Sequence, residues 1–258
     1  MFSDAHCHLT LENSEDVAQA KGFVEQARKA GVGLLLAVGV TPETSEAAVK
    51  FAASQEGLYA GVGIHPWTGW VRFIDESTYQ QLKGLASQPK VRVISEIGLD
   101  LARDPSTKDI QLQALRMQMR LAREMRLPIN FHCRGAHDEM VPFLRAQRAQ
   151  KAGGIIHGFN GTPQQLQDWL RMGFLISIGR SVLRPENTAL HEAVKQIPLE
   201  RLVLETDTSP RSVDDAGDKI DPSDVRHVAA KVAELRGGTA EEIGEIATRN
   251  LKQLLKLA

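Results

Sequence analysis

Eight short runs of β-branched and other apolar residues recur along the chain, each of a length that suits one strand. They are Met1–His6, Gly33–Val40, Leu58–His65, Val91–Leu99, Pro128–His132, Gly154–Phe159, Phe174–Ile178 and Leu202–Asp207. Runs that stay apolar on successive residues are typical of strands that are buried on both faces of a parallel sheet. The pattern therefore predicts eight strands.

The longer stretches between these runs have helical spacing. One of them places apolar side chains on a single stripe, at Leu112, Leu115, Met119, Ala122 and Met125. Thr41-Pro42-Glu43 and Ser14-Glu15-Asp16 are typical helix starts, and Gly31 is a typical helix stop. A last amphipathic helix is expected over Ala240–Leu257. Strands and helices thus alternate through the whole chain.

This alternation predicts an α/β fold that is a single (β/α)8 barrel of the TIM type. Dividing 258 residues by eight strands gives about 32 residues for each strand and helix, which suits such a barrel. An open, doubly wound sheet is the alternative, and it needs fewer strands. Residues 1–258 are expected to form one domain, and Ser209–Asp224 a loop over the C-terminal end of the barrel.

Composition narrows the classes of protein that remain. The hydrophobic fraction of 42% excludes disorder as the main state, and 31 Lys and Arg against 32 Asp and Glu give a net charge of −1. Without an overall basic charge, contact with a nucleic acid must be local. Two cysteines cannot form a framework of disulfides and Met1–Thr10 lacks the pattern of a signal peptide, so we expect a cytoplasmic protein. No apolar run approaches the ~20 residues that cross a bilayer, so we expect no membrane contact. No obligate protein partner is expected.

The placement of the histidines is the main chemical signal. Three of the eight lie in helical stretches, at His137, His191 and His227. The other five lie at or just beyond the downstream ends of predicted strands, at His6, His8, His65, His132 and His157. Because the C-terminal ends of the strands of a parallel barrel surround one mouth, these side chains are expected to converge there.

Asp4-Ala5-His6-Cys7-His8 has a period of two residues, which aims Asp4, His6 and His8 at one side of the first strand. Two imidazoles about 7 Å apart along a strand can bind one cation. Structural or surface histidines explain an isolated pair equally well. Cys7, and likewise Cys133 beside His132, should point away from the ligands into the core.

Four further polar residues end otherwise apolar runs, at Glu96, His132, His157 and Asp207. Burial of an unpaired carboxylate costs several kcal/mol, and a bound cation removes that cost. Together with His6 and His8, the set suits two divalent ions of the Mg, Mn or Zn kind, with Glu96 able to bridge them. The alternative is a buried polar network that only stabilises the barrel.

The chain resembles the TatD-type metal-dependent deoxyribonuclease family, within the amidohydrolase-like superfamily. The resemblance covers almost the whole length, from Asp4-Ala5-His6-Cys7-His8-Leu9 to Arg249-Asn250-Leu251. Its matching pieces are Gly63-Ile64-His65-Pro66, Glu96-Ile97-Gly98-Leu99-Asp100, Gln111, Gln118, Leu127-Pro128, His132-Cys133-Arg134, His157-Gly158-Phe159, Ser177-Ile178 and Glu205-Thr206-Asp207.

The resemblance implies a barrel with a two-metal centre that hydrolyses phosphodiester bonds of nucleic acid, and that centre would consist of His6, His8, Glu96, His132, His157 and Asp207. His65 would then lie near the substrate phosphate. As a bare sequence feature it can equally be a residue that hydrogen-bonds a ligand.

In the favoured mechanism the two metals lower the pKa of a water molecule and bind the scissile phosphate, with Glu96 and Asp207 as the catalytic residues. Glu205 is expected to be the partner of a histidine rather than a base. Arg134, Arg180 and Arg211 each follow a strand end, where an arginine can hold a phosphate; surface charge is the other interpretation.

The favoured function is that of a deoxyribonuclease or exonuclease acting on single-stranded DNA. A hydrolase of another ester or amide on the same metals, such as a D-aminoacyl-tRNA deacylase, is the alternative. Val91–Leu99 holds no lysine to bridge the metals, which argues against a cyclic amide but not against an ester. A non-catalytic metal-binding module would be expected to lack a ligand, and none of the expected ones is missing.

Overall fold

Eight parallel strands form one sheet in which every strand pairs with its neighbours in the chain. The computed structural model that shows this sheet describes residues 1–9, 14–71, 74–209, 212–214, 217 and 219–258. In chain order the strands are β1 (Phe2–Cys7), β2 (Val32–Val38), β3 (Leu58–Val62), β4 (Val91–Asp100), β5 (Ile129–Arg134), β6 (Gly154–Ile156), β7 (Leu175–Ile178) and β8 (Leu202–Leu204). Each predicted run overlaps one strand, so the prediction of eight strands is confirmed.

The sheet curves until its first and last members meet. Just beyond β8, the backbone N–H of Asp207 donates to the carbonyl of His6 at 3.0 Å, and the N–H of His8 donates to the carbonyl of Thr208 at 2.7 Å. These two bonds close the barrel at its C-terminal end. The predicted (β/α)8 barrel is therefore confirmed, and the open sheet is not the fold.

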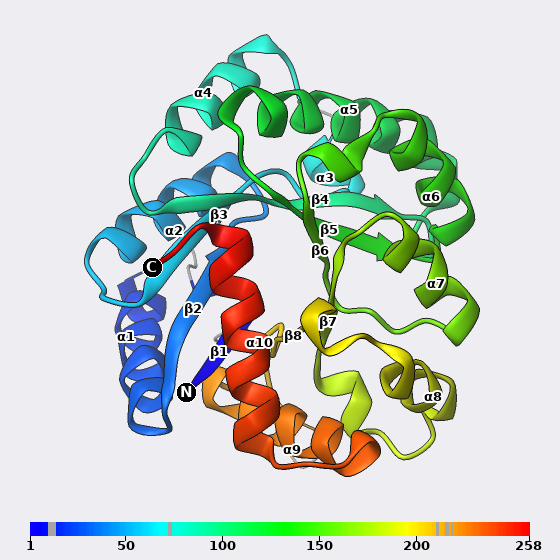
Figure 1. The fold of residues 1–258 in the computed structure, drawn as a ribbon. Coiled ribbons are helices and arrows are strands. Elements are labelled where there is room, and N and C mark those ends of the chain that lie inside the picture. The colour runs from blue at the N-terminus through cyan, green and yellow to red at the C-terminus, as the bar shows by residue number, and fades with distance from the viewer. Residues whose placement is uncertain (10–13, 72–73, 210–211, 215–216, 218) are drawn as a thin grey trace.

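Helices surround the strands (Figure 1). Among the described residues they are α1 (Ser14–Lys29), α2 (Pro42–Ala53), α3 (Thr68–Val71), α4 (Glu76–Ala86), α5 (Lys108–Met125), α6 (His137–Ala146), α7 (Pro163–Arg171), α8 (Thr188–Gln196), α9 (Val225–Arg236) and α10 (Ala240–Leu255). Short 3₁₀ turns lie at η1 (Pro105–Thr107), η2 (Ala149–Lys151), η3 (Arg180–Leu183), η4 (Leu199–Arg201) and η5 (Pro222–Asp224). None of these helices is apolar over a length that would cross a membrane.

The helix ends follow the local signals in the sequence. The Thr41 hydroxyl accepts the backbone N–H of Thr44, with Pro42 in the first turn of α2, which satisfies a donor that the helix itself leaves unpaired. After α1 the chain turns at Gly31, whose φ of 83° lies in the left-handed region that glycine adopts without strain. Both predicted helix boundaries are confirmed.

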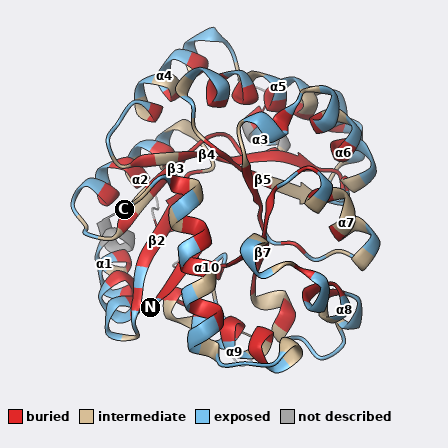
Figure 2. Cartoon of the chain, viewed as in Figure 1, coloured by how far each residue is buried: buried red, intermediate tan, exposed pale blue. Residues whose placement is uncertain are grey.

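The predicted apolar stripe on α5 faces the sheet. Leu115, Met119 and Ala122 are buried, while Leu112 and Met125 are partly buried against the same core. Figure 2 shows the result for the molecule: buried strands lie inside, and the outer helix faces are exposed.

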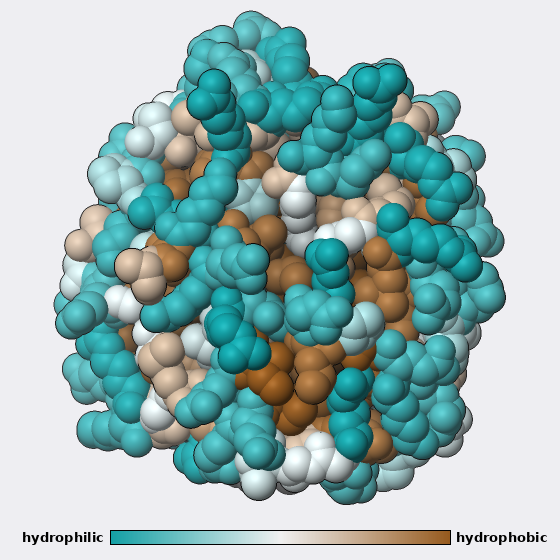
Figure 3. Space-filling view, in the orientation of Figure 1, coloured by the Kyte–Doolittle hydropathy of each residue, from teal (hydrophilic) through white to brown (hydrophobic). Residues whose placement is uncertain are grey.

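The interior of the barrel is filled by small and medium aliphatic side chains. Ala5, Leu36, Val93, Ile155 and Val203 belong to a buried cluster that also includes two residues of α10, Leu251 and Leu255. Figure 1 shows α10 lying across the strands near the start of β1. On this face, seen in Figure 3, hydrophilic residues surround a smaller apolar area. The opposite end of the barrel, where the strands end, holds the polar cluster described next.

Candidate metal centre

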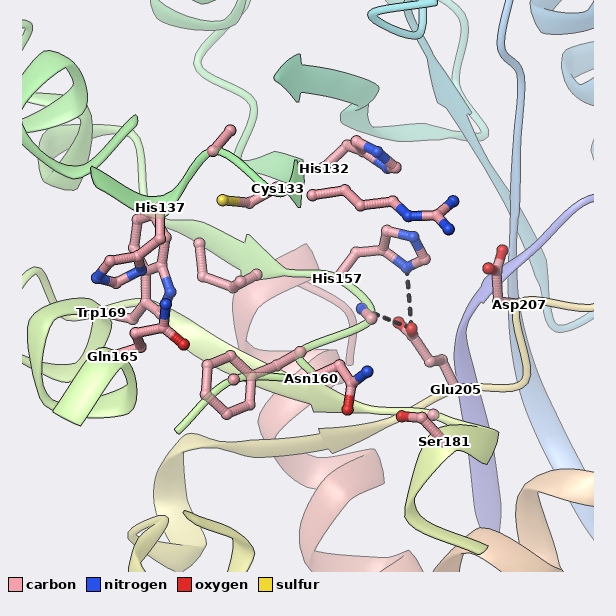
Figure 4. Close-up of a pocket in the computed structure, with 18 of the residues that line it drawn as sticks. His132, Cys133, His137, His157, Asn160, Gln165, Trp169, Ser181, Glu205 and Asp207 are labelled. Atoms are coloured by element: carbon pink, nitrogen blue, oxygen red, sulfur yellow. Dashed lines mark hydrogen bonds and ion pairs between the residues drawn. The ribbon is translucent and has the colours of Figure 1, made fainter. Parts of the chain in front are cut away.

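The C-terminal mouth of the barrel gathers four imidazoles and two carboxylates from five separate segments of the chain. They are His6 and His8 of β1 and its end, Glu96 of β4, His132 of β5, His157 after β6 and Asp207 after β8. All six residues that the sequence predicted as metal ligands therefore lie together. Figure 4 shows His132, His157 and Asp207 on the pocket that opens from this cluster.

Glu96 lies at the centre of the cluster and is 2% exposed. Its Oε2 is 3.4 Å from Nε2 of His6 and 3.6 Å from Nε2 of His8. Its Oε1 is 2.5 Å from Nδ1 of His132 and 3.3 Å from Nε2 of His157. The two oxygens thus face two different pairs of imidazoles, which is the geometry of a carboxylate that can bridge two ions.

Asp207 completes the group on the β1 side. Its Oδ1 lies 3.3 Å from Nε2 of His8 and 3.7 Å from Nε2 of His6, and half of its side chain is exposed. The residue has a φ of 53°, a left-handed conformation that is uncommon outside glycine but that aspartate tolerates. The bond from its N–H to the carbonyl of His6 holds this turn, so the carboxylate points at the histidines.

Two imidazoles are oriented by carboxylates behind them. Nδ1 of His157 lies 2.9 Å from Oε1 of Glu205, and Nε2 of His132 lies 3.3 Å from Oδ2 of Asp100. Glu205 is fully buried and also accepts the N–H of Gly158 and the hydroxyl of Ser177. Glu205 therefore has the predicted place beside a histidine.

The other two imidazoles have protein partners of a different kind. Nδ1 of His8 lies 3.2 Å from the carbonyl oxygen of Val38, and Nδ1 of His6 lies 3.0 Å from the carboxamide nitrogen of Asn130. A carbonyl can only accept, so His8 donates its Nδ1–H outward and its Nε2 carries a lone pair. His8 is thus held as histidines that bind metals usually are, whereas the Asn130 carboxamide fixes the ring of His6 through its nitrogen.

The cluster fits a cation because its nitrogen and oxygen atoms converge on the same small volume. In the group of His6, His8 and Glu96, one ligand atom from each residue lies within 4.8 Å of the other two. Oxygen and imidazole nitrogen together suit Mg, Mn or Zn.

His65 differs from the four other imidazoles. It is 4% exposed, and its Nδ1 accepts the backbone N–H of Trp67 at 3.2 Å. The neutral ring therefore carries its proton on Nε2, which lies 3.5 Å from Oε1 of Glu96. Nε2 of His65 also lies 3.3 Å from Nδ1 of His132, and His65, Glu96 and His132 form a second group whose ligand atoms lie within 4.8 Å of one another.

The electrostatics of the cluster keep its carboxylates ionised. Burial opposes the charge on Glu96, but the imidazoles of His65, His157 and His132 hold its pKa well below the usual value. Burial, together with the nearby His157, lowers the pKa of His6 and keeps it neutral. Burial disfavours the charge on His132 and His157 as well, but the neighbouring carboxylates raise the pKa of both rings, so a cation that binds there would displace protons.

Sequence reasoning missed the role of two buried glutamines of α5. The side chain of Gln118 accepts the N–H of Ile64 at 2.7 Å and donates to its carbonyl at 3.1 Å. Gln111 makes the same pair of bonds to the backbone of Asp100, at 2.8 and 3.1 Å. These bonds fix the residue before His65 and the residue that orients His132. Both glutamines were part of the resemblance, but nothing in it indicated these contacts.

Asp4 is a second residue whose role the sequence did not assign. It is fully buried and accepts the backbone N–H groups of His6 and Thr206 at 3.1 and 3.0 Å, and the Thr206 hydroxyl at 2.5 Å. It joins the strand that carries His6 to the turn that carries Asp207. The period-two pattern placed Asp4 on the correct side of β1 but gave no partner for it.

The predicted arginines lie beside the cluster. Arg134 ends β5 and Arg180 begins η3, and both line the pocket next to the imidazoles. Nη1 of Arg180 is 3.7 Å from Oδ2 of Asp224. Arg211 lies outside the described residues. Of the two cysteines, Cys7 is in the core as predicted, whereas Cys133 is half-buried and lines the pocket.

The family model described as TatD related DNase matches residues 3–256 of this chain. Among curated proteins, the uncharacterized metal-dependent hydrolase YabD of Bacillus subtilis is 35% identical over 100% of both chains. The 3'-5' ssDNA/RNA exonuclease TatD of Klebsiella pneumoniae is 33% identical over 95% of each chain.

Solved structures give the same picture of the fold. YjjV, a TatD homolog of Escherichia coli, superposes with a TM-score of 0.89 at 28% identity, over 100% of this chain and 98% of its own. An organophosphorus hydrolase variant of Deinococcus radiodurans superposes with a TM-score of 0.70 at 16% identity, over 98% of this chain and 92% of its own. The second likeness concerns the fold alone.

Proposed function

The chain belongs to the TatD-related DNase family, and from that premise we propose that it is a metal-dependent exonuclease acting on single-stranded nucleic acid, DNA in the first place. Several relatives carry the name of a 3'-5' ssDNA/RNA exonuclease, among them that of Klebsiella pneumoniae. The site residues of this chain support the same reaction.

The arrangement around Glu96 carries the proposal. One ion would be held by His6, His8 and Asp207, the other by His132 and His157, with Glu96 between them. Mg, Mn and Zn all suit this donor set. When bound, such ions lower the pKa of a water molecule and neutralise the charge that grows on the phosphoryl oxygens.

The protein residues would divide the remaining work. Asp207 is the acid-base candidate, because its half-exposed carboxylate faces both the histidines and the pocket and can accept a proton from the attacking water. His65 would donate from Nε2 to a phosphate oxygen, since its Nδ1 is engaged by the Trp67 N–H. Arg134 and Arg180 would hold phosphate oxygens along the pocket.

This local set of cations explains how a chain with a net charge of −1 can bind a polyanion. The overall charge provides no attraction, so we expect the contact to come from local positive charge, including bound metal ions and the two arginines beside them. Binding would consequently depend on the metal.

The alternative of a D-aminoacyl-tRNA deacylase is not favoured. The metal centre itself suits esters of carboxylic acids as well as phosphodiesters. However, the family model is described by its DNase activity, and the curated relative of Klebsiella pneumoniae is named an exonuclease of single-stranded DNA and RNA. A nuclease is therefore the function to test first.

The test is cleavage of a single-stranded DNA oligonucleotide labelled separately at its 3′ and 5′ ends, with Mg²⁺, Mn²⁺ or EDTA. We expect stepwise shortening that needs the metal and that is absent from Glu96→Ala. The label that is lost first gives the direction of cleavage. If metal-loaded protein leaves DNA and RNA oligonucleotides intact, the proposed function is wrong.

A further inference from the structure

Trp67 is not a candidate metal ligand, but its two N–H groups reach the surroundings of two histidines at the barrel mouth. It follows His65 by two residues and directly precedes α3. Its backbone N–H donates to Nδ1 of His65 at 3.2 Å, and its indole Nε1–H donates to Oδ2 of Asp100 at 3.2 Å. Because both nitrogens of Trp67 can only donate, the direction of each bond is fixed. One residue thus contacts an imidazole directly and also a carboxylate at the end of the neighbouring strand.

The carboxylate of Asp100 extends this contact to His132. Its Oδ2 also lies 3.3 Å from Nε2 of His132, and its Oδ1 accepts the backbone N–H of Arg103 at 3.2 Å. Asp100 is 2% exposed, so water has little access to replace these partners. A carboxylate that is bound at both oxygens turns little, and it holds the imidazole bonded to it in one orientation. Trp67 therefore reaches His132 through Asp100.

The indole of Trp67 is itself held by contacts to its ring. Cζ of Arg103 lies over the ring, 4.4 Å from its centroid, where an aromatic face attracts a guanidinium. The imidazole of His65 packs edge-on against the same ring, with 4.7 Å between centroids and an interplanar angle of 72°. Rotation of the indole would disturb both contacts as well as the bond to Asp100. The indole N–H is consequently kept on that carboxylate.

The two histidines that Trp67 reaches meet at the same oxygen of Glu96. Nδ1 of His132 lies 2.5 Å from Oε1 of Glu96, and Nε2 of His65 lies 3.5 Å from it. The two ring nitrogens are 3.3 Å apart. At these distances a small rotation of either ring changes the space that Oε1 and His132 leave for a cation. The groups that fix the two rings should therefore influence the affinity for metal on this side of Glu96.

We propose that Trp67 is a positioning residue of the metal centre, which orients His132 through its indole N–H and Asp100, and His65 through its backbone N–H. A role confined to packing would lower the stability of the fold and leave the affinity for metal unchanged. The proposal rests on the metal centre of the proposed function, but not on the identity of the substrate.

The first test is calorimetric titration of the metal-free protein with Mn²⁺, which needs no substrate. Trp67→Phe removes the indole N–H and keeps the backbone N–H. Loss of a group that orients a ligand typically costs about 10–100-fold in metal affinity, and since the indole acts one bond further out, we expect a loss of about fivefold. An unchanged affinity would overturn the proposal.

Trp169→Phe is the matched control, because it makes the same chemical change at a tryptophan with a packing role. Trp169 of α7 is 1% exposed, and its ring packs against those of His137 and Phe174. We expect this variant to have a lower Tm and the Mn²⁺ affinity of the wild type. A loss of affinity equal to that in Trp67→Phe would attribute the effect to packing and overturn the proposal.

Trp67→His is the rescue variant. The five-membered ring of histidine carries Nε2 at the position of the indole Nε1, so its N–H can still donate to Asp100. Histidine and phenylalanine both lack the fused ring of tryptophan, and a difference between the two variants therefore reports on the N–H. We expect Trp67→His to bind Mn²⁺ within twofold of the wild type. Equally weak binding by both variants would contradict the role of the indole N–H.

A double-mutant cycle tests whether Asp100 is the link. Trp67→Phe should weaken Mn²⁺ binding about fivefold in the wild type, but should change it little in the Asp100→Ala background, because residues that act through one another are not additive. Equal losses in the two backgrounds would overturn the proposal. A wild type that binds Mn²⁺ but cleaves no nucleic acid contradicts the proposed function instead, so the two failures are distinguishable.

Discussion

At the scale of residues, the position of each ring nitrogen distinguishes the histidines at the barrel mouth. The residues alone placed five imidazoles there, and only the family resemblance set His65 apart from the ligands; in the structure its Nδ1 accepts a backbone N–H. Similarly, Glu205 is defined by the 2.9 Å between its Oε1 and Nδ1 of His157. Residue types at strand ends predicted which groups meet. Only the folded geometry shows which nitrogen of each ring faces inward.

Replacement of Glu205 by glutamine should weaken metal binding while preserving volume. The amide loses the charge that orients and polarises His157, and loss of such an outer partner typically costs about 10–100-fold in metal affinity. Calorimetric titration with Mn²⁺ measures the effect. Glu200→Gln, at an exposed position in η4, is the control and should bind as the wild type does. Wild-type affinity in Glu205→Gln would contradict the orienting role.

The two thiols should be almost unreactive in the folded, metal-free protein. Burial raises the pKa of Cys133 to about 12 and that of Cys7 well above its usual value. A raised pKa means less thiolate at pH 8, and the thiolate is the reactive form. A chromogenic thiol reagent should react slowly with the native protein and quickly with two thiols in denaturant. Rapid reaction of native Cys133, identified with Cys133→Ser, would show that the pocket exposes it as a thiolate.

At the scale of elements, α5 contributes to the site without providing any of the six candidate metal ligands. Its stripe of apolar residues packs on the sheet, as the spacing predicted, and its buried Gln111 and Gln118 bind the backbone of Asp100 and Ile64. A period of 3.6 residues predicts which face is buried. It does not predict what a buried glutamine bonds, because those partners come from loops whose paths the sequence does not specify.

Gln118→Leu should destabilise the protein and impair catalysis together. The change keeps the volume but leaves the N–H and carbonyl of Ile64 without their partner, at a cost of about 1–3 kcal/mol. Displacement of Ile64 should also move His65 and lower kcat more than the affinity for metal. Urea unfolding and steady-state kinetics measure the two effects. Gln113→Leu, at an exposed position of the same helix, should change the free energy of unfolding by less than about 0.5 kcal/mol.

At the scale of the whole molecule, the barrel brings together residues from one end of the chain to the other. His6 and Asp207 lie in the same group because the first strand closes on the turn after the last. The rhythm of strands and helices was sufficient to predict this closure. The pocket beyond the metals was not predictable, since α6 and α7 meet through His137 and Asp168, whose spacing carries no signal in the sequence.

Metal binding should stabilise the whole fold, because the ligands come from five segments that are separate in the unfolded chain. A metal concentration 100 times the dissociation constant contributes about 2.7 kcal/mol, or roughly 5–10 °C in Tm for a protein of this size. Differential scanning calorimetry with Mn²⁺ and with EDTA measures the shift. It should shrink as the pH falls, since protonated imidazoles cannot bind metal. The same Tm in both solutions would contradict the account.

The central claim is that Glu96 lies between two metal ions at the mouth of the barrel. The most direct measurement is the anomalous scattering of a Mn²⁺-soaked crystal. Two peaks are predicted, one among His6, His8 and Asp207 and one between His132 and His157, each next to a different oxygen of Glu96. A crystal of Glu96→Ala should lose one or both peaks. Peaks elsewhere, or none at the barrel mouth of the wild type, would contradict the claim.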